Sequence, residues 1–124
     1  MGHRSRLGCI VIDCQTADLA PAAEFWAAAL GGEATLDAEG KYAEISAQGA
    51  LKVLVQAVDH PPRVHLDIEA DDKQAEVARL EALGAKVLAP VKGWIVMEAP
   101  TGHRFCVVNP QGDAFGPNAK SWED

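Results

Sequence analysis

The sequence lacks the long hydrophobic runs and the paired cysteines that mark membrane and secreted proteins. The longest apolar run near its start, CIVI at residues 9–12, is followed by Asp13, and it is too short for the core of a signal peptide or for a membrane span. We therefore expect a cytoplasmic protein without a membrane contact. Cys9 and Cys14 lie five residues apart in one predicted strand, so they point to opposite faces and cannot bridge. We expect reduced thiols.

Basic charge is also scarce. The chain has 11 Lys and Arg against 18 Asp and Glu, with a formal net charge of −7, and such a surface repels phosphate backbones. We expect no nucleic-acid partner. The sequence contains no nucleophile elbow, phosphate loop, dinucleotide fingerprint or Cys-x-x-Cys pair, which sets those classes of enzyme aside.

An internal repeat organises the 124 residues, which are enough for one domain. Asp18, Ala22, Leu30 and Gly31 recur at a constant offset of 53 as Asp71, Ala75, Leu83 and Gly84. Each set frames an amphipathic segment with an Asp placed to cap a helix and a Gly placed to end it. Phe25 and Trp26 in the first segment are predicted to lie in the core.

Strand-like runs surround both predicted helices. One run precedes each helix, and three follow it: residues 32–36, 41–47 and 51–58 in the first half, and 85–91, 93–99 and 103–109 in the second. Each half therefore reads as βαβββ, which predicts an α+β fold with module one at about 7–58 and module two at about 63–110. We expect residues 1–6 to be a loose tail and residues 111–124 to be an arm that Phe115 or Trp122 fastens.

Three segments resemble the glyoxalase-like members of the vicinal oxygen chelate superfamily. AEFWAAALGGE resembles their first-helix signature, RVHLDIEADD the start of their second module, and EAPTGHRFCVVNP their closing hairpin. The resemblance implies that the two modules form a curved mixed sheet whose cupped face holds the functional site. It also implies that a metal-dependent member would bind a divalent ion with a residue from the first strand and a late strand of each module.

The residues at those metal-binding positions argue against the ion. They are Val11, Gln56, His65 and Cys106. Val11 cannot ligate, Gln56 and Cys106 stand where Glu is typical, and only His65 is a good ligand for the divalent ions of this family. We therefore expect neither a metal nor another cofactor.

His65 is the candidate catalytic residue, either as an acid–base group in the cup or as a polar residue on a half-solvated strand face. Strand alternation predicts that Val64, Leu66 and Ile68 pack under the helices, while His65, Asp67 and Glu69 face the concave side. Carboxylates near the imidazole favour its charged form, so binding or activity should depend on pH around neutrality and weaken in His65→Ala.

Other residues are candidates for binding a small molecule. Asp13 and Asp67 either line the cup or face solvent and orient Arg side chains, and Cys106 is either a small buried hydrophobe or a reactive thiol. Trp94 and Met97 are predicted to line an apolar pocket. The candidate substrate-binding set is Val11, Asp13, Gln56, Asp67, Trp94, Met97 and Cys106.

Two functions remain open. The first is a small-molecule enzyme of the glyoxalase type, a lyase or isomerase that works without a metal and uses His65 as acid or base. The second is a non-catalytic binder that sequesters a cationic drug, as in the bleomycin-resistance branch. Either protein is expected to be a homodimer, because a sheet face that two helices do not cover usually has a partner.

Overall fold

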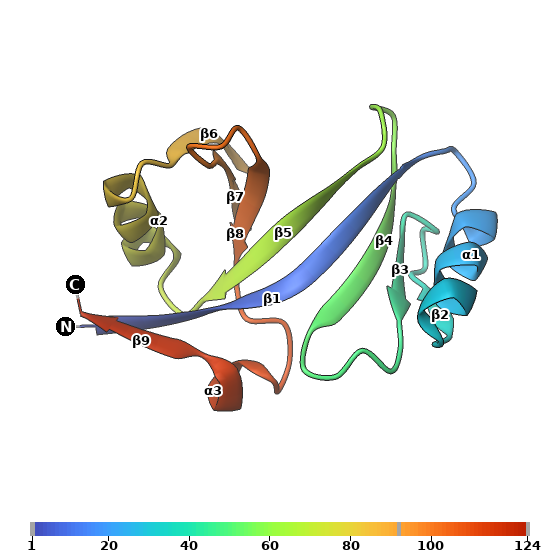
Figure 1. Ribbon diagram of the computed structural model, residues 1–124, viewed down its shortest axis with the longest axis horizontal. Coiled ribbons are helices and arrows are strands. Elements are labelled where there is room, and N and C mark those ends of the chain that lie inside the picture. The colour runs from blue at the N-terminus through green and yellow to red at the C-terminus, as the bar shows by residue number, and fades with distance from the viewer. Residues whose placement is uncertain (1, 92, 124) are drawn as a thin grey trace. The chain divides into compact units, whose positions relative to one another are not determined.

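The computed structural model describes residues 2–91 and 93–123 (Figure 1). The chain divides into two compact units, one formed by Cys9–His65 and the other by the residues up to Gly8 together with those from Leu66 onward. We call them the module-one unit and the module-two unit, because each contains one of the predicted modules. Met1, Lys92 and Asp124 lie outside the described residues.

The module-one unit has the predicted βαβββ order. Its elements are the second part of β1 (Gly2–Gln15), α1 (Ala20–Leu30), β2 (Ala34–Leu36), β3 (Tyr42–Ile45) and β4 (Lys52–Val58). The strand order is β2-β3-β4-β1. β1 and β4 are parallel, from Cys9↔Lys52 to Gln15↔Val58, and the other pairs are antiparallel. A parallel pair needs a crossover connection, which here contains α1.

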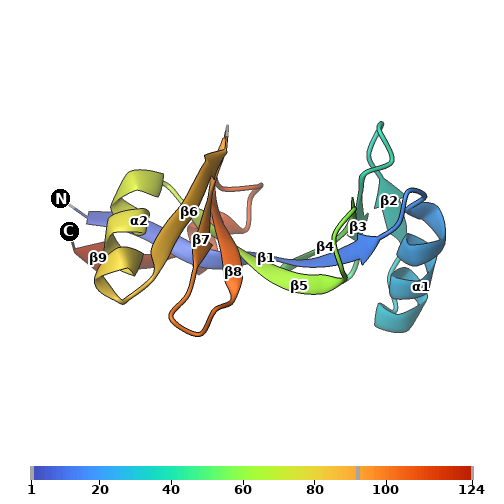
Figure 2. The ribbon, with the colours of Figure 1, turned by 90° about the horizontal axis from the view of Figure 1, so that it is seen from above.

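Helix α1 covers one face of this sheet, and Figures 1 and 2 show it beside β2 and β3. Gly31 ends the helix at φ 76°, a left-handed conformation that glycine adopts without strain. The core between helix and strands contains Leu19, Ala23, Ala27, Ala43, Ile45, Val53 and Val55. Trp26 packs against it as predicted, but the prediction for Phe25 is wrong, since that side chain is 62% exposed.

The module-two unit repeats the order. Its elements are β5 (Arg63–Ala70) from Leu66 onward, α2 (Lys73–Ala82), β6 (Lys86–Val91), β7 (Trp94–Glu98) and β8 (Arg104–Val108). The strand order is β5-β8-β7-β6, with β5 and β8 parallel and the other pairs antiparallel. Helix α2 contacts β6 and β8 over a core of Ala70, Val77, Ile95, Met97, Phe105 and Val107. The βαβββ reading is thus confirmed for both modules.

The N-terminal caps differ from the prediction. The carboxylate of Asp72, not of Asp71, caps α2 and accepts a hydrogen bond from the backbone N–H of Ala75 at 3.0 Å. Asp71 accepts instead from the backbone N–H of Arg4 at 2.8 Å. In α1 the cap position is occupied by Leu19, and Asp18 accepts a long 3.4 Å bond from the N–H of Ala20.

The two ends of the chain are more ordered than expected. Gly2–Arg6 is not a loose tail, because it forms the first part of β1 and pairs with β9 (Lys120–Glu123) from Gly2↔Glu123 to Ser5↔Lys120. The predicted arm contains β9 and a short helix, α3 (Phe115–Asn118). Both predicted fastenings are present: Phe115 is buried, and the indole N–H of Trp122 donates to the hydroxyl of Ser5 at 2.8 Å.

The packing predicted for β5 is wrong at two positions. Val64 is 58% exposed and Leu66 is 41% exposed, so neither packs under a helix. The reason is that α2 starts just after the strand and lies over its end, where Ile68 and Ala70 join the core. Glu69 is 3% exposed, with its carboxylate 3.7 Å from Nε of Arg6.

The three cysteines, all within the described residues, form no disulfide, as expected. Among the described residues, no helix is long and apolar enough to cross a membrane.

Candidate functional site

A buried carboxylate bound to a histidine forms the centre of the candidate site. In the module-one unit, Oδ2 of Asp13 lies 2.9 Å from Nδ1 of His65. The Asp13 side chain is 2% exposed and that of His65 is 17% exposed. A carboxylate accepts, so the proton of this bond belongs to Nδ1 of the imidazole. Of the alternatives left open for Asp13, the one in which it faces solvent is therefore wrong.

Strand alternation explains where Asp13 points. Its neighbours Ile12 and Cys14 pack against the core under α1, so Asp13 projects from the opposite face of the sheet. Val11 shares that face and is 2% exposed, which makes it a packing residue in this unit. Burial raises the pKa of the Cys14 thiol, a hydrogen bond with Trp26 opposes the rise, and the charge of Asp13 adds to it.

Two further side chains surround Asp13, and sequence reasoning missed both. Nε of Arg63 lies 3.8 Å and Nε2 of His60 lies 3.9 Å from Oδ2 of Asp13. His60 lies in the connection between β4 and β5, and Arg63 is the first residue of β5. The signal was present as HPPR at residues 60–63, where the proline pair holds a short extended connector beside the end of β1.

The hydrogen bonds of His60 define its tautomer. Nδ1 donates to the carbonyl oxygen of Pro61 at 2.8 Å, and Nε2 then accepts from Nη2 of Arg63 at 3.3 Å. Arg63 is thus held between His60 on one side and Asp13 on the other.

One oxygen of the buried carboxylate is unsatisfied. Oδ1 of Asp13 has no hydrogen-bond partner among the described residues, although it is shielded from solvent. A buried charged group left partly unpaired is energetically costly and is rare in folded proteins. Such an atom in a cluster of basic side chains is typical of a site whose last partner is a ligand.

Gln56 extends the polar surface along the sheet. It is the register partner of Asp13 on β4, and its side-chain amide donates to the phenolic oxygen of Tyr42 at 3.1 Å. Tyr42 also lines an open groove of about 500 Å³, together with Thr35, Leu36, Asp37, Glu44, Ser46 and Leu54. The structure therefore brings Asp13, Gln56 and His65 together in one unit.

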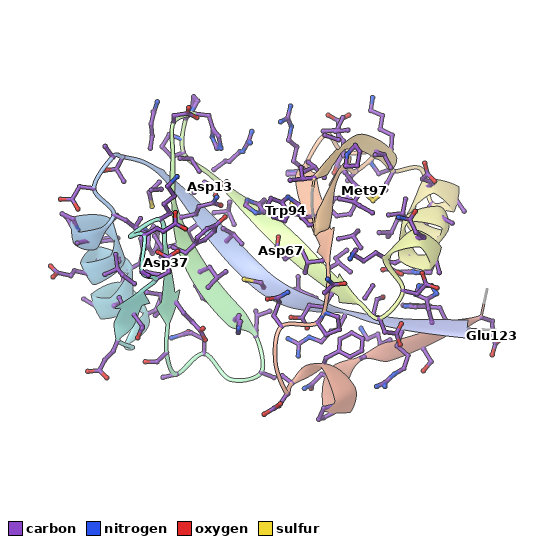
Figure 3. All side chains as sticks on the ribbon, turned by 180° about the vertical axis from the view of Figure 1, so that it is seen from behind. Asp13, Asp37, Asp67, Trp94, Met97 and Glu123 are labelled. Atoms are coloured by element: carbon purple, nitrogen blue, oxygen red, sulfur yellow. The ribbon has the colours of Figure 1, made fainter. Side chains whose placement is uncertain are left out.

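The remaining candidates belong to the module-two unit. Asp67 on β5 and Cys106 on β8 are register partners. Cys106 is also the register partner of Val96 on β7, and Trp94 lies two residues before Val96 on the same strand. Met97 is fully buried in the core under α2 and is not part of this surface. Three residues apart on one strand, Trp94 and Met97 point to opposite faces, as Figure 3 shows. The predicted pairing of Trp94 with Met97 in one pocket is wrong for that reason.

The donor set does not fit the metal site implied by the resemblance. Val11 offers no lone pair and is packed, and the amide of Gln56 already donates to Tyr42. His65 contributes Nδ1 to Asp13. The carboxylate of Asp67 on β5 and the thiol of Cys106 on β8 belong to register partners. The family quartet therefore lacks the oxygen ligands that a hard divalent ion prefers.

Chemically, the arrangement at Asp13 suits proton transfer. The carboxylate fixes His65 in the tautomer with the proton on Nδ1, which places the basic lone pair on Nε2. The same carboxylate stabilises the imidazolium that forms when Nε2 takes up a proton.

Comparisons with known proteins agree with the fold. The chain is similar to a hypothetical protein from Bacillus halodurans C-125, with 12% identity, 88% of this chain and 96% of that chain covered, and a TM-score of 0.66. It is also similar to a glyoxalase/bleomycin resistance protein/dioxygenase superfamily member from Vibrio splendidus 12B01, with 13% identity, coverage of 82% and 97%, and a TM-score of 0.53. A structure described as NAD-dependent benzaldehyde dehydrogenase from Legionella pneumophila has 13% identity, coverage of 82% and 99%, and a TM-score of 0.57. At these identities the likeness concerns the fold alone.

The search among curated proteins found no match. The family model described as Glyoxalase-like domain matches residues 9–108. This range contains both βαβββ modules, from the part of β1 in the module-one unit to the end of β8. The chain therefore belongs to the glyoxalase-like domain family of the vicinal oxygen chelate superfamily, as the three sequence segments predicted.

Proposed function

We propose that this protein binds a small organic molecule on the strand face that carries Asp13 and His65, and catalyses proton transfer at a carbon next to a carbonyl group. The reaction class is that of an isomerase or lyase. The observation that carries the proposal is the 2.9 Å bond from Nδ1 of His65 to the buried carboxylate of Asp13.

His65 acts as the general base. Nε2 takes the proton from the carbon, and the Asp13 carboxylate stabilises the resulting charge on the ring. The ring then returns the proton to the same or a neighbouring carbon, so the step needs no oxidant or reductant. Positioned acid–base groups of this kind contribute roughly 10²- to 10⁴-fold to a rate. Gln56, with its amide bonded to Tyr42, is a polar contact for the bound molecule.

Hydrogen–deuterium exchange in D₂O tests this chemistry without knowledge of the product. A panel of small aldehydes, ketones and 2-oxo acids is incubated with the protein, and incorporation of deuterium next to the carbonyl is followed by NMR. We expect exchange of at least one compound with the native protein and its loss, by about 100-fold or more, in His65→Gln.

His103→Gln is the matched control. His103 is exposed in the closing hairpin and lies 2.8 Å from the hydroxyl of Thr101, in the other unit. The His103→Gln variant should leave the deuterium exchange unchanged. Equal exchange in the native and His65→Gln proteins would refute the proposal, as would the absence of exchange over the whole panel.

A second function is favoured by the groove on β2, β3 and β4. Two carboxylates, Asp37 and Glu44, and the phenol of Tyr42 line it beside the apolar side chains of Leu36 and Leu54. This lining, in a chain of net charge −7, suits a cationic ligand, and it supports sequestration of a drug of the bleomycin type without catalysis.

Calorimetric titration with bleomycin tests the binder. Glu44→Gln should weaken binding several-fold, because the groove loses one of its charges, whereas Glu24→Gln on the exposed face of α1 should not. No binding by the native protein, or equal losses in both variants, would exclude this function.

A further inference from the structure

Arg63 is an oriented guanidinium at the proposed catalytic site. Nη2 donates to Nε2 of His60 at 3.3 Å, and Nε lies 3.8 Å from Oδ2 of Asp13. Its side chain is nevertheless 44% exposed, so solvent and ligands reach it. An arginine braced on two sides loses less conformational freedom when it binds an anion than one on an open surface.

His60 helps to orient Arg63. Nδ1 of His60 lies 2.8 Å from the carbonyl oxygen of Pro61, and Nε2 lies 3.3 Å from Nη2 of Arg63, so the ring is fixed on one side and contacts the guanidinium on the other. Among the described residues, Nη1 of Arg63 makes no hydrogen bond, so one edge of the guanidinium remains for a carboxylate. A fixed cation here is notable because acidic residues outnumber basic ones in this chain, 18 to 11.

The unsatisfied oxygen of Asp13 is an independent sign of a ligand. Oδ1 is buried and accepts no hydrogen bond from the described residues, while Oδ2 of the same carboxylate is bound to His65. A carboxylate oxygen can only accept, so the missing partner is a hydroxyl or N–H donor. Both oxygens belong to one carboxylate, so this acceptor is next to the Arg63 guanidinium.

We propose that the substrate is a small 2-oxo carboxylate with a hydroxyl group on C3. Its carboxylate binds the guanidinium of Arg63, and its hydroxyl donates to Oδ1 of Asp13. The C3–H bond then lies between a carbonyl and a hydroxyl, where removal of the proton by Nε2 of His65 gives an enediolate. The proton returns from the imidazolium, so the exchange is balanced. This inference rests on the proposed proton-transfer function.

Three probe molecules separate the two contacts. Hydroxypyruvate carries the carboxylate and the hydroxyl, pyruvate lacks the hydroxyl, and dihydroxyacetone replaces the carboxylate with a neutral group. Dissociation constants are measured for each by NMR titration. Hydrogen bonds to charged groups are stronger than those between neutral groups, so loss of either group should weaken binding about tenfold or more.

Variants assign the contacts to residues. Arg63→Gln should weaken hydroxypyruvate and pyruvate about tenfold or more and leave dihydroxyacetone unchanged, while Arg63→Lys should restore part of the loss because the charge returns without the planar fork. Arg104→Gln, an exposed arginine on β8, is the matched control and should change nothing. Dihydroxyacetone binding as tightly as hydroxypyruvate, or Arg63→Gln binding as tightly as the native protein, would overturn the inference.

The same measurements keep the two proposals apart. His65→Gln should abolish deuterium exchange at C3 of hydroxypyruvate but still bind the molecule, since Arg63 and Asp13 remain. Binding that depends on Arg63, without any exchange in the native protein, would refute the proton-transfer function and support the assignment of the ligand class. Exchange of other carbonyl compounds without binding of hydroxypyruvate would do the opposite.

Discussion

Replacing Glu76 by alanine should destabilise the protein more than any change at the surface. Glu76 lies on α2 with 0% exposure, and it binds side chains from two separate segments. Its Oε1 lies 2.7 Å from Nε2 of His3 and accepts from Nε of Arg79 at 2.8 Å, while Oε2 accepts from Nη2 of Arg79 at 2.8 Å. Arg79 in turn stacks on the Trp122 ring, 3.9 Å from its centroid.

The size of the effect follows from what each partner can do without the carboxylate. Arg79 is 25% exposed and can rehydrate, whereas His3 is 1% exposed and is left without this acceptor in a buried position. Removing one partner of a buried charged pair costs about 3–5 kcal/mol. That is a large part of the roughly 5–15 kcal/mol that keeps a domain folded.

The pH dependence gives the loss a signature. Burial alone would raise the pKa of Glu76, but hydrogen bonds from Arg79, His3 and Ser5 outweigh it and the pKa is lowered from its ordinary value of 4.5. A carboxyl group with a lowered folded-state pKa stabilises fully above its unfolded value and loses that contribution as the pH falls through the folded value. The stability difference between native protein and Glu76→Ala should therefore be constant above about pH 4.5 and shrink below it.

Urea unfolding followed by circular dichroism measures this difference. Glu81→Ala is the matched control, because Glu81 is an exposed residue of the same helix and its removal should stay within about 0.5 kcal/mol. A loss below about 1 kcal/mol for Glu76→Ala, or a difference that grows in acid, would show that the network does not hold the ends of the chain to α2.

Other predictions concern packing, association and metal. Leu66→Ala should cost only about 1 kcal/mol in urea unfolding, well below the loss for a fully buried leucine, since Leu66 is 41% exposed. We propose a homodimer that covers exposed apolar residues such as Val64, which is 58% exposed. Light scattering should give the mass of a dimer, and Val64→Asp should lower that mass. A native protein that is a monomer at tens of micromolar would contradict this. Metal analysis after purification without chelator should find no stoichiometric ion that depends on His65; one that His65→Gln abolishes would refute our reading of the donor set.

The fold could be predicted because its signals are local and repeated. The offset that relates Leu30 and Gly31 to Leu83 and Gly84 fixed two helix ends, and turn residues between β-rich runs fixed the strands that follow. The ends of the chain gave no such signal. Gly2–Arg6 has no hydrophobic alternation of its own, and its strand exists because β9 supplies backbone partners more than 110 residues away in sequence.

The site was predicted in part for the same reason. His65 and Asp13 were selected from their positions on predicted strands. A strand pattern cannot show, however, that the carboxylate of Asp13 is buried and bound to the imidazole of His65. His60 was missed because a residue in a connection has no periodicity, and Arg63 because it is only the first residue of its strand. The proximity of both to Asp13 depends on how β4 turns into β5. Met97 was misplaced because its apolar character is equally suited to a core and to a pocket, and only its facing on β7 decides between them.

The repeat also shows why one module and not the other carries the proposed chemistry. Asp13 and Asp67 occupy equivalent strand positions at an offset of 54, and each has a register partner at the matching place, Gln56 or Cys106. In the module-one unit, Asp13 has an imidazole bound to it and an arginine beside it. Those partners come from residues 60–65, which follow the first module and have no counterpart at the end of the second, where the chain continues into α3 and β9. The difference between two strands that carry an equivalent carboxylate therefore lies in the connection that follows each module. Exchanging the HPPR connector for a neutral one such as QPPQ should abolish hydroxypyruvate binding while both βαβββ modules stay folded.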